Sequence, residues 1–310
     1  MQVHRQLSQL PVFNKAVITI GSFDGVHTGH QQIIRQLKEE AAKVAGETVI
    51  ITFYPHPRKV IGTTKNEFNL LNTMDEKIVL LSKEGIDHLV IVPFTRDFSD
   101  QPAVSYIKDF LVSNFHPHTI IIGYDHRFGK NREGDFTLLE KYKKEFGYKV
   151  KEIPEHVLNE VTVSSSKIRE AILAGDVSKA TDLLGYSYFF EGLVVHGDKR
   201  GRTIGFPTAN LRMEDKEKLI PGNGVYAVTC QLSTVNRQLK GMMNIGVRPT
   251  VDGLRRMIEV NLFDFDEDIY GKLMKVQTVK RLRDEKKFGG LDELKQQLQN
   301  DRQAAMQALL

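Results

Sequence analysis

The chain has 310 residues, of which 41% are hydrophobic and 26% are charged, and its formal net charge is +4. These values are typical of a globular protein with room for two domains of roughly 120 to 180 residues each. Basic and acidic residues alternate, no apolar run approaches the roughly 20 residues of a membrane span, and the first residues lack the apolar core of a signal peptide. We therefore expect a cytoplasmic protein, a monomer or weak homo-oligomer, with no nucleic-acid or membrane partner.

The first patterned segment runs from the apolar Ala16–Ile20 through the glycine-rich Gly21–His30 into a helix-like stretch, Gln31–Lys43. The order strand, turn, helix gathers free backbone N–H groups and the positive end of a helix dipole at one point. His27 and His30 lie at the same point. The pattern predicts a site for a nucleotide triphosphate. The other turn residues that we assign to ATP are Gly21, Phe23, Asp24 and Gly29.

Two other interpretations of this turn remain. The glycines could serve only a tight turn, with the two histidines as surface residues. Zinc could bind the histidines, but a zinc site needs at least a third protein ligand and no Glu or Cys lies nearby. The strand–turn–helix context favours the phosphate site over both.

From residue 16 to about residue 153, short β-branched runs alternate with longer amphipathic ones. The expected strands are Ala16–Ile20, Thr48–Phe53, His88–Val92, Thr119–Ile122 and Tyr148–Ile153. This alternation predicts an α/β fold of the Rossmann-like type, with a parallel sheet, helices on both faces and ligands beyond the carboxyl ends of the strands.

Two further loops leave such strand ends, Tyr54–Pro57 and Gly123–Lys130. Both could reach the same crevice as the glycine-rich turn. The second loop resembles a P-loop, but five residues separate its glycines where Walker A has four, and Asn131 follows the lysine. We therefore reject a P-loop there.

The segment Val163–Glu170 places a serine cap before a helix that we expect to run to Leu173. Its polar N-terminus is either a second anion site or a simple helix cap, and these residues do not decide between the two. Helical sequence continues through Asp176–Leu184 and stops at Gly185. We place the domain boundary there, which gives domains of residues 1–185 and 186–310.

Beyond residue 186, short strands are separated by glycine-rich turns, which predicts a small antiparallel β-barrel. The expected strands are Tyr188–His196, Gly224–Leu232, Leu239–Val247, Met257–Phe265 and Lys272–Leu282. An amphipathic helix, Leu291–Leu309, follows and should cover the barrel core. Cys230 is the only cysteine, and we expect it to be a buried apolar residue without chemistry.

Three glycines in the second half, Gly197, Gly201 and Gly205, are spaced so that the backbone could wrap phosphates. Ordinary β-turns would explain them equally well. Thr208 and Asn210 follow, and their side-chain oxygens are the hard ligands that Mg²⁺ prefers.

Glu259 lies in a strand where alternation puts it on the face opposite Ile258 and Val260. A carboxylate that faces the mouth of a barrel is a candidate general base. A solvent-facing glutamate is the more frequent case, so the residue pattern leaves both roles open.

Together, these motifs resemble those of the bacterial bifunctional riboflavin kinase/FMN adenylyltransferase family, also called FAD synthetases, over nearly the whole chain. In the first half the motifs are Gly21–His30, Phe53–Pro57, Gly123–Gly129 and Ser165–Arg169. In the second half they are Gly205–Asn210, Gly224–Tyr226, Met243–Gly246, Arg248–Thr250, and Glu259 ahead of Asp264–Gly271.

The resemblance implies that the first domain transfers AMP from ATP to FMN, which yields FAD and pyrophosphate, with His27 and His30 at the ATP phosphates. The attacking FMN phosphate is already anionic, so this reaction needs charge stabilisation rather than a strong base. Ser164 and Arg169 join the ATP site by the same resemblance. The flavin site of this domain is assigned to Pro55, His56, Asp125, Arg127 and Phe128.

The resemblance implies that the second domain phosphorylates the 5′-hydroxyl of riboflavin with MgATP. A primary alcohol is a poor nucleophile until its proton can leave, which fits the assignment of Glu259 as base. Thr208 and Asn210 would hold Mg²⁺, and Gly197–Gly205 would cover the phosphates. The residues that would approach the isoalloxazine are Arg283, Asp284 and Phe288.

Two positions depart from the family pattern. Members often carry His where Asn261 stands and Thr where Ser166 stands, and both replacements keep a hydrogen-bonding group.

Two other classes of protein fit parts of the chain. A class I aminoacyl-tRNA synthetase relative would account for His27–His30 and Ser165–Ile168, but it needs a basic RNA-binding surface. The barrel could instead be an oligonucleotide-binding module, although the chain has no tryptophan. Conversion of riboflavin into FMN by residues 186–310 alone would separate an enzyme from a binding module.

Overall fold

The computed structural model describes residues 1–62, 68–154, 163–197, 200–233, 237–250 and 253–310. The chain divides by its internal contacts into two compact units, Met1–Ser164 and Ser165–Leu310. Two helices, α9 (Ser165–Leu173) and α10 (Val177–Leu184), therefore pack with the second unit, although they precede the predicted boundary. The boundary after residue 185 remains a prediction about the two domains.

The first unit is built on a six-stranded parallel sheet with the order β1-β4-β3-β2-β5-β6. Its strands are β1 (Gln2–His4), β2 (Val17–Ile20), β3 (Thr48–Tyr54), β4 (His88–Pro93), β5 (Thr119–Gly123) and β6 (Lys149–Ile153). The five expected strands are confirmed. The sequence did not predict β1, because a strand of three residues is too short to show a pattern of its own; it pairs in parallel with the first half of β4.

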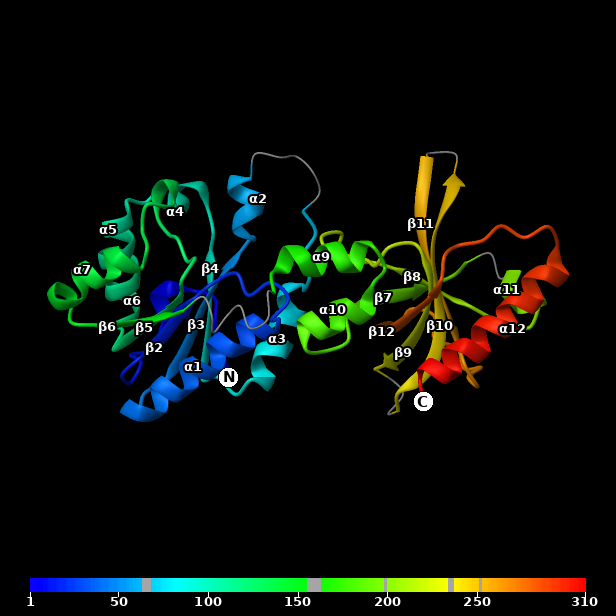
Figure 1. Ribbon diagram of the computed structural model, residues 1–310, viewed down its shortest axis with the longest axis horizontal. Helices are drawn as coiled ribbons and strands as arrows, with labels where there is room; N and C mark the ends of the chain where they lie inside the picture. The colour runs from blue at the N-terminus through cyan, green and yellow to red at the C-terminus, as the bar shows by residue number, and fades with distance from the viewer. Residues whose placement is uncertain (63–67, 155–162, 198–199, 234–236, 251–252) are drawn as a thin grey trace. The chain divides into compact units, whose positions relative to one another are not determined.

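Helices flank this sheet, as Figure 1 shows. They are α1 (Thr28–Val44), α2 (Pro57–Ile61), α3 (Met74–Lys83), α4 (Arg96–Ser99), α5 (Ala103–Ser105), the π-helical turn η2 (Tyr106–Val112), α6 (Ser113–Phe115) and α7 (Phe136–Phe146), with short turns η1 (Leu7–Gln9) and η3 (Lys130–Arg132). Alternate strand residues are buried on both faces of the sheet: Ile51 packs in the cluster that contains Phe110, and its neighbour Ile50 is buried too. Both faces are therefore covered, as in other parallel sheets.

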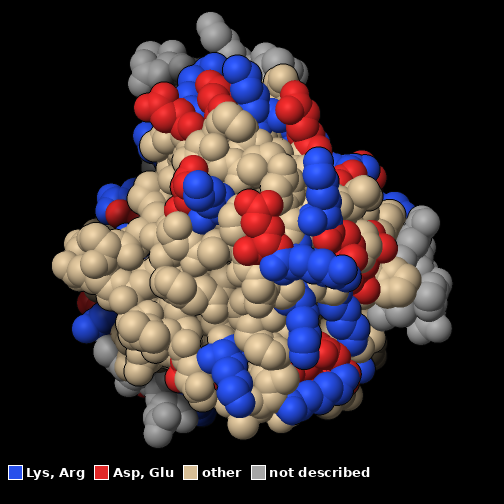
Figure 2. All heavy atoms as spheres, turned by 90° about the vertical axis from the view of Figure 1, so that its left-hand side faces the viewer, with Lys and Arg blue, Asp and Glu red and all other residues tan. Residues whose placement is uncertain are grey.

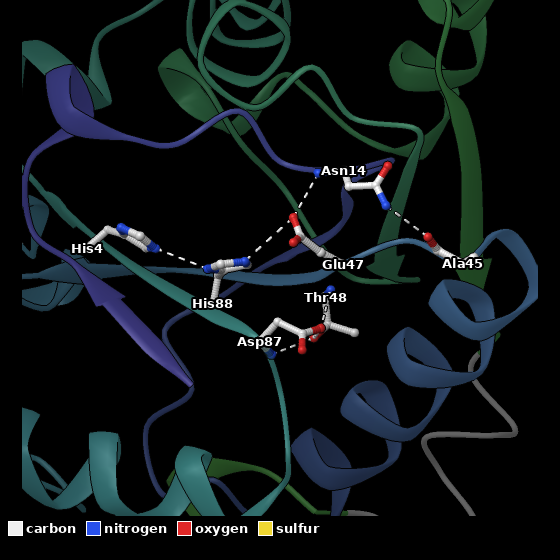
Figure 3. A network of polar contacts seen from close by, with 7 residues as sticks. All are labelled: His4, Asn14, Ala45, Glu47, Thr48, Asp87 and His88. Carbon is white, nitrogen blue, oxygen red and sulfur yellow. Dashed lines mark hydrogen bonds and ion pairs between the residues drawn. The ribbon is translucent and has the colours of Figure 1, made fainter.

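Near the amino ends of β3 and β4, polar contacts fasten the edge strand β1 (Figure 3). His4 Nε2 lies 3.2 Å from His88 Nδ1, and His88 Nε2 lies 3.6 Å from Glu47 Oε2. The same Glu47 oxygen accepts a hydrogen bond from the backbone N–H of Asn14 at 2.8 Å. Phe13 packs edge-on against the His88 ring. These side-chain contacts add to the backbone pairing of a strand that has only three residues.

Charges of both signs share the surface of the first unit. On the face drawn in Figure 2, Lys and Arg side chains are interspersed with Asp and Glu. Lys143 pairs with Glu140 on α7, and Lys151 pairs with Glu40 at 2.7 Å. This face carries no broad area of one charge.

The second unit contains a closed antiparallel barrel with the strand order β10-β11-β8-β7-β12-β9. Its strands are β7 (Phe189–Val195), β8 (Ala209–Arg212), β9 (Gly224–Leu232), β10 (Leu239–Thr250), β11 (Gly253–Leu262) and β12 (Leu273–Arg283). Five of them confirm the expected strands. The prediction missed β8, whose four residues are too few to show alternation. Cys230 is buried in β9 as expected, and burial raises the pKa of its thiol.

In the described part of this unit the helices are α9, α10, α11 (Arg200–Thr203) and α12 (Leu291–Ala308). From Leu298 onward, α12 covers the barrel as predicted, because Ala305 is buried and Leu298, Ala308 and the following Leu309 pack against the cluster of Met242 and Phe263. The first turn of α12 does not, since Leu291 is 65% exposed. That turn instead borders a cavity.

Candidate active sites

The first unit has a cavity of about 570 Å³ at the carboxyl ends of β2, β3 and β5. β2 and β5 are neighbours in the sheet, and the chain builds outward from β2 to β3 and β4 before it returns to β5. Ligands bind at such a reversal of strand order. Seven of the site residues predicted from the sequence line this cavity: Gly21, Phe23, His30, His56, Asp125, Arg127 and Phe128.

The glycine-rich turn ends at α1, which begins before the predicted Gln31. His27 is its N-cap, and the Nδ1 atom accepts a hydrogen bond from the backbone N–H of His30 at 3.3 Å. The two imidazole rings stack 3.7 Å apart. A Cβ on Gly29 would lie 3.2 Å from the His27 ring, so a glycine leaves room for this stack. His27 and Gly29 therefore shape the helix start from outside the cavity wall.

His30 lies between the His27 ring and Phe23, whose centroid is 4.9 Å away. Burial, the neighbouring His27 and the charge of Lys77 hold the pKa of His30 well below the ordinary value of 6.5. The imidazole is therefore neutral at physiological pH. A neutral imidazole still carries one N–H, with which it can donate a hydrogen bond to a phosphate oxygen.

Asp24 has contacts that the sequence did not predict. It is 1% exposed, and its Oδ1 accepts hydrogen bonds from the backbone N–H groups of Leu71 and Asn72 at 3.0 and 3.3 Å. These residues lead into α3. Asp24 thus joins the glycine-rich turn to the approach to α3, and its assignment to ATP remains a prediction.

The other end of the cavity is aromatic. Phe53 lies 5.4 Å from Phe94, and Tyr106 stacks on Phe128 at 5.0 Å. Phe98 lies between them, 5.8 Å from Tyr106. Sequence reasoning missed Phe94, Phe98 and Tyr106. The first two follow β4, whose carboxyl end reaches the same edge of the sheet, and that placement was the available signal.

Polar groups surround the aromatic end. Arg127 pairs with Asp135, which caps α7 through the backbone N–H of Leu138. His126 is packed near Phe128, and burial lowers the pKa of His126 to about 4. Pro55 precedes the cavity residue His56 but does not itself form part of the wall.

Two residues assigned to ATP lie at the division between the units. Ser164 is the last residue of the first unit, and Arg169 lies on α9 in the second. Their assignment to ATP therefore stays a prediction.

The barrel has its own cavity, of about 540 Å³. The residues predicted from the sequence that line it are Gly201, Thr208, Asn210, Glu259, Arg283 and Phe288. Asn210 on β8 and Glu259 on β11 are direct register partners, so their side chains share one face of the barrel. Glu259 lines the cavity from the face of β11 opposite the buried Ile258 and Val260, and the Arg248 Nη2 atom lies 3.2 Å from its Oε2. The strand alternation therefore predicted the correct face.

The remaining predicted residues of the second unit lie outside this wall. A Cβ on Gly197 would come within 2.1 Å of the Asn210 amide, so a larger residue there would displace that side chain. Gly205 has a φ of +82°, which favours glycine. Asp284 accepts a hydrogen bond from Arg281 at 2.5 Å. Asp198 and Lys199, between the first two glycines, lie outside the described residues.

α12 supplies one wall of the barrel cavity that the sequence did not predict. Leu291, Leu294, Leu298 and Asp301 all border it. The apolar stripe of this helix was predicted to cover core residues; Leu298 packs against the core and also borders the cavity, while Leu291 and Leu294 border the cavity.

Known proteins match both halves of the chain. Residues 10–167 match the family model for FAD synthetase, and residues 184–309 match that for riboflavin kinase. The chain is 38% identical to a bifunctional riboflavin kinase/FMN adenylyltransferase of Haemophilus influenzae, over 95% of this chain and 94% of that protein. It is 39% identical to the protein of the same name from Escherichia coli, over 95% of this chain and 93% of that protein.

A solved structure also matches the whole chain. It is titled a macrolide-efflux protein from Streptococcus pneumoniae, and it superposes with a TM-score of 0.87 at 31% identity, over 98% of each chain. Among the residues that the structure describes, no helix is both long and apolar enough to cross a membrane. Both family models and the curated relatives agree on one assignment: the chain belongs to the bifunctional riboflavin kinase/FMN adenylyltransferase family.

Proposed function

We propose that the two cavities divide the two reactions of this family between them. The cavity in residues 1–164 adenylylates FMN, and the barrel cavity phosphorylates riboflavin. The observation that carries this division is that each cavity combines a large apolar wall with a different polar end. One polar end is a helix N-terminus with a neutral histidine, and the other is a carboxylate beside an amide.

In the first cavity, an oxygen of the FMN phosphate attacks the α-phosphorus of ATP. The new P–O bond joins FMN to AMP, and the bond to the leaving pyrophosphate breaks. The nucleophile is already ionised, so the protein must bind and stabilise negative charge rather than remove a proton. The start of α1 provides backbone N–H groups, and His30 provides a neutral donor beside them.

The aromatic end of the same cavity suits the isoalloxazine ring of FMN. Flat aromatic ligands bind well against such walls, where stacking adds to the burial of apolar surface. Phe128, with Phe98 and Tyr106 beside it, would contact the ring. His56, Asp125 and Arg127 would provide the polar contacts that fix its orientation.

In the barrel cavity, Glu259 accepts the proton of the riboflavin 5′-hydroxyl as that oxygen attacks the γ-phosphorus of ATP, and the bond from this phosphorus to the leaving ADP breaks. Arg248 orients the Glu259 carboxylate. The flavin would lie against Phe288 and the apolar side chains of α12, with Arg283 at the edge.

Thr208 and Asn210 suit Mg²⁺ because a hydroxyl and an amide oxygen are hard ligands and both residues line the wall beside Glu259. When bound, Mg²⁺ would neutralise charge on the phosphates of ATP. Thr208 and Asn210 would hold it on the side of the cavity next to the base.

We also propose that the protein works in the cytoplasm as a monomer or weak homo-oligomer, on small molecules and without nucleic acid. The small net charge of +4 and the mixed charges in Figure 2 support the last point. Light scattering at several protein concentrations tests the oligomeric state.

The whole assignment has one direct test. Purified protein receives riboflavin and MgATP, and the flavins are followed by chromatography. We expect FMN first and FAD later, and we expect both to disappear when EDTA removes the divalent metal. Failure to form either product contradicts the assignment.

A further inference from the structure

Lys77 on α3 is a buried lysine that contacts the glycine-rich turn from behind the cavity wall. It is 4% exposed, and its Nζ atom donates a hydrogen bond to the carbonyl oxygen of Ser22 at 2.7 Å. The Thr52 hydroxyl donates to the same carbonyl at 3.1 Å. Ser22 lines the cavity, so one charged and one neutral donor fix a carbonyl of the phosphate turn.

The contact between α3 and the turn is reciprocal. Asp24 in the turn accepts the backbone N–H groups of Leu71 and Asn72, immediately before α3. Lys77, one turn into α3, donates back to Ser22. Hydrogen bonds in both directions hold the helix and the turn in one relative position.

Burial of an ammonium group is unfavourable unless other groups compensate it. Burial lowers the pKa of Lys77 to about 8, and the Asp24 carboxylate partly opposes this shift. His30 on α1 is a further titratable group beside Lys77, and the charge of Lys77 contributes to the low pKa of His30 after burial and His27. The ammonium is therefore a positive charge fixed beside the start of α1, where the phosphates of ATP would lie.

We propose that Lys77 is a positioning residue for adenylyl transfer: it fixes the Ser22 carbonyl, and so the turn, and it places a positive charge behind the ATP phosphates. This inference rests on the proposed assignment of the cavity to FMN adenylylation. The lysine needs no contact with either substrate. Its effect passes through the turn and through the electrostatic potential.

Three variants separate the effect of the hydrogen bond to the Ser22 carbonyl from the effect of the positive charge of Lys77. Lys77→Met removes the charge and the donor while keeping the length of the side chain. Lys77→Arg keeps the charge, and Thr52→Val removes only the neutral donor to the same carbonyl. FAD formation from supplied FMN is measured as kcat and KM for ATP, and FMN formation from riboflavin by the same samples serves as the internal control.

We expect Lys77→Met to lower kcat/KM for ATP in FAD formation by at least roughly tenfold, which corresponds to about 1.4 kcal/mol of transition-state stabilisation. Lys77→Arg should retain most of the activity, and Thr52→Val should stay within about threefold of the wild type, as expected for one neutral hydrogen bond. FMN formation should be unchanged in all three. Equal activity of Lys77→Met and Thr52→Val overturns the electrostatic role.

The pH profile of kcat/KM provides a readout that a purely structural role would not move, because it reports groups of the free enzyme. The wild type should lose FAD formation above about pH 8, where Lys77 loses its proton. In Lys77→Arg this decline should move to higher pH. A wild-type decline that persists unchanged in Lys77→Arg overturns the proposal, even if Lys77→Met does not fold. A wild-type protein that makes no FAD from FMN refutes the cavity assignment instead.

Discussion

The guanidinium of Arg283, at the end of β12, donates two parallel hydrogen bonds to the Asp301 carboxylate on α12, at 2.8 and 2.6 Å. Asp301 is 3% exposed. Gln297, one turn earlier on the helix, donates to the same carboxylate at 2.9 Å. The pair ties α12, which forms an apolar wall of the barrel cavity, to β12, whose last residue lines the same cavity.

Asp301→Asn should therefore weaken both the fold and the flavin site. We expect the free energy of unfolding to fall by about 2–4 kcal/mol, because the substitution leaves a partly buried guanidinium without its counter-charge. The KM for riboflavin should rise by roughly tenfold as α12 loosens. Urea unfolding and kinase kinetics measure the two effects.

The control for this prediction is Asp264→Asn, which removes an exposed ion pair with Arg302 on the same helix. Exposed pairs contribute less than about 1 kcal/mol. If both variants behave alike, burial of the Arg283–Asp301 pair has no special effect.

Glu259→Gln preserves shape and hydrogen bonding but cannot accept the hydroxyl proton of riboflavin. FMN formation should fall by on the order of 10²–10⁴, the usual contribution of a positioned general base. FAD formation from supplied FMN should stay nearly unchanged, because its nucleophile is already ionised. Retention of more than about a tenth of the kinase activity, well outside that range, would make Glu259 a structural strand carboxylate.

His30→Ala should lower FAD formation and spare FMN formation. Loss of one preorganised donor to a developing negative charge costs on the order of 10²–10³ in rate. The two activities are measured in the same sample, so a common loss would show that His30 supports the fold rather than the reaction.

The stability of the contact between His4 on β1 and His88 on β4 should depend on pH. Burial and the neighbouring His88 lower the pKa of His4 below the ordinary value of 6.5. A lowered histidine pKa means that the unfolded strand binds more protons than the folded one. The attachment is therefore full above about pH 6.5 and weakens as the pH falls through the lowered value.

Hydrogen exchange of the β1 amides tests this, since the Gln2 N–H donates to the Asp87 carbonyl at 2.7 Å. Exchange should be faster at pH 5 than at pH 7 after correction for intrinsic rates. His4→Phe keeps an aromatic ring without the titration and should remove the difference. A difference of the same size in His4→Phe would assign the titration to another group.

Sequence patterns predicted the parts of this fold whose cause is local. The β-branched run Thr48–Phe53 forms a strand in any covered sheet, and the turn before α1 has its glycines and histidines within ten residues. β1 and β8 were missed because they are too short to show a strand pattern, and their pairing with neighbouring strands is what makes them strands. Phe98 and Asp301 were missed for a related reason, since their positions in the cavities depend on how distant elements pack.

Asp24 illustrates the limit most clearly. A carboxylate in a phosphate-binding turn has an obvious candidate role at the ligand. That role stays a prediction, and in the structure the Asp24 Oδ1 accepts hydrogen bonds from residues 47 and 48 positions away in the sequence. No local pattern carries that information.

The order of strands in the barrel has a consequence for how the protein is synthesised. β12 lies between β7 and β9, so the barrel cannot close until the residues up to Arg283 have left the ribosome. The parallel sheet, by contrast, has all its strands once Ile153 has emerged. Domains fold largely as units during synthesis, beginning at the N-terminus. The nascent chain can therefore complete its first sheet before its barrel. The strand that carries Glu259 is synthesised before β12, so the site around Glu259 cannot form until β12 has joined the barrel.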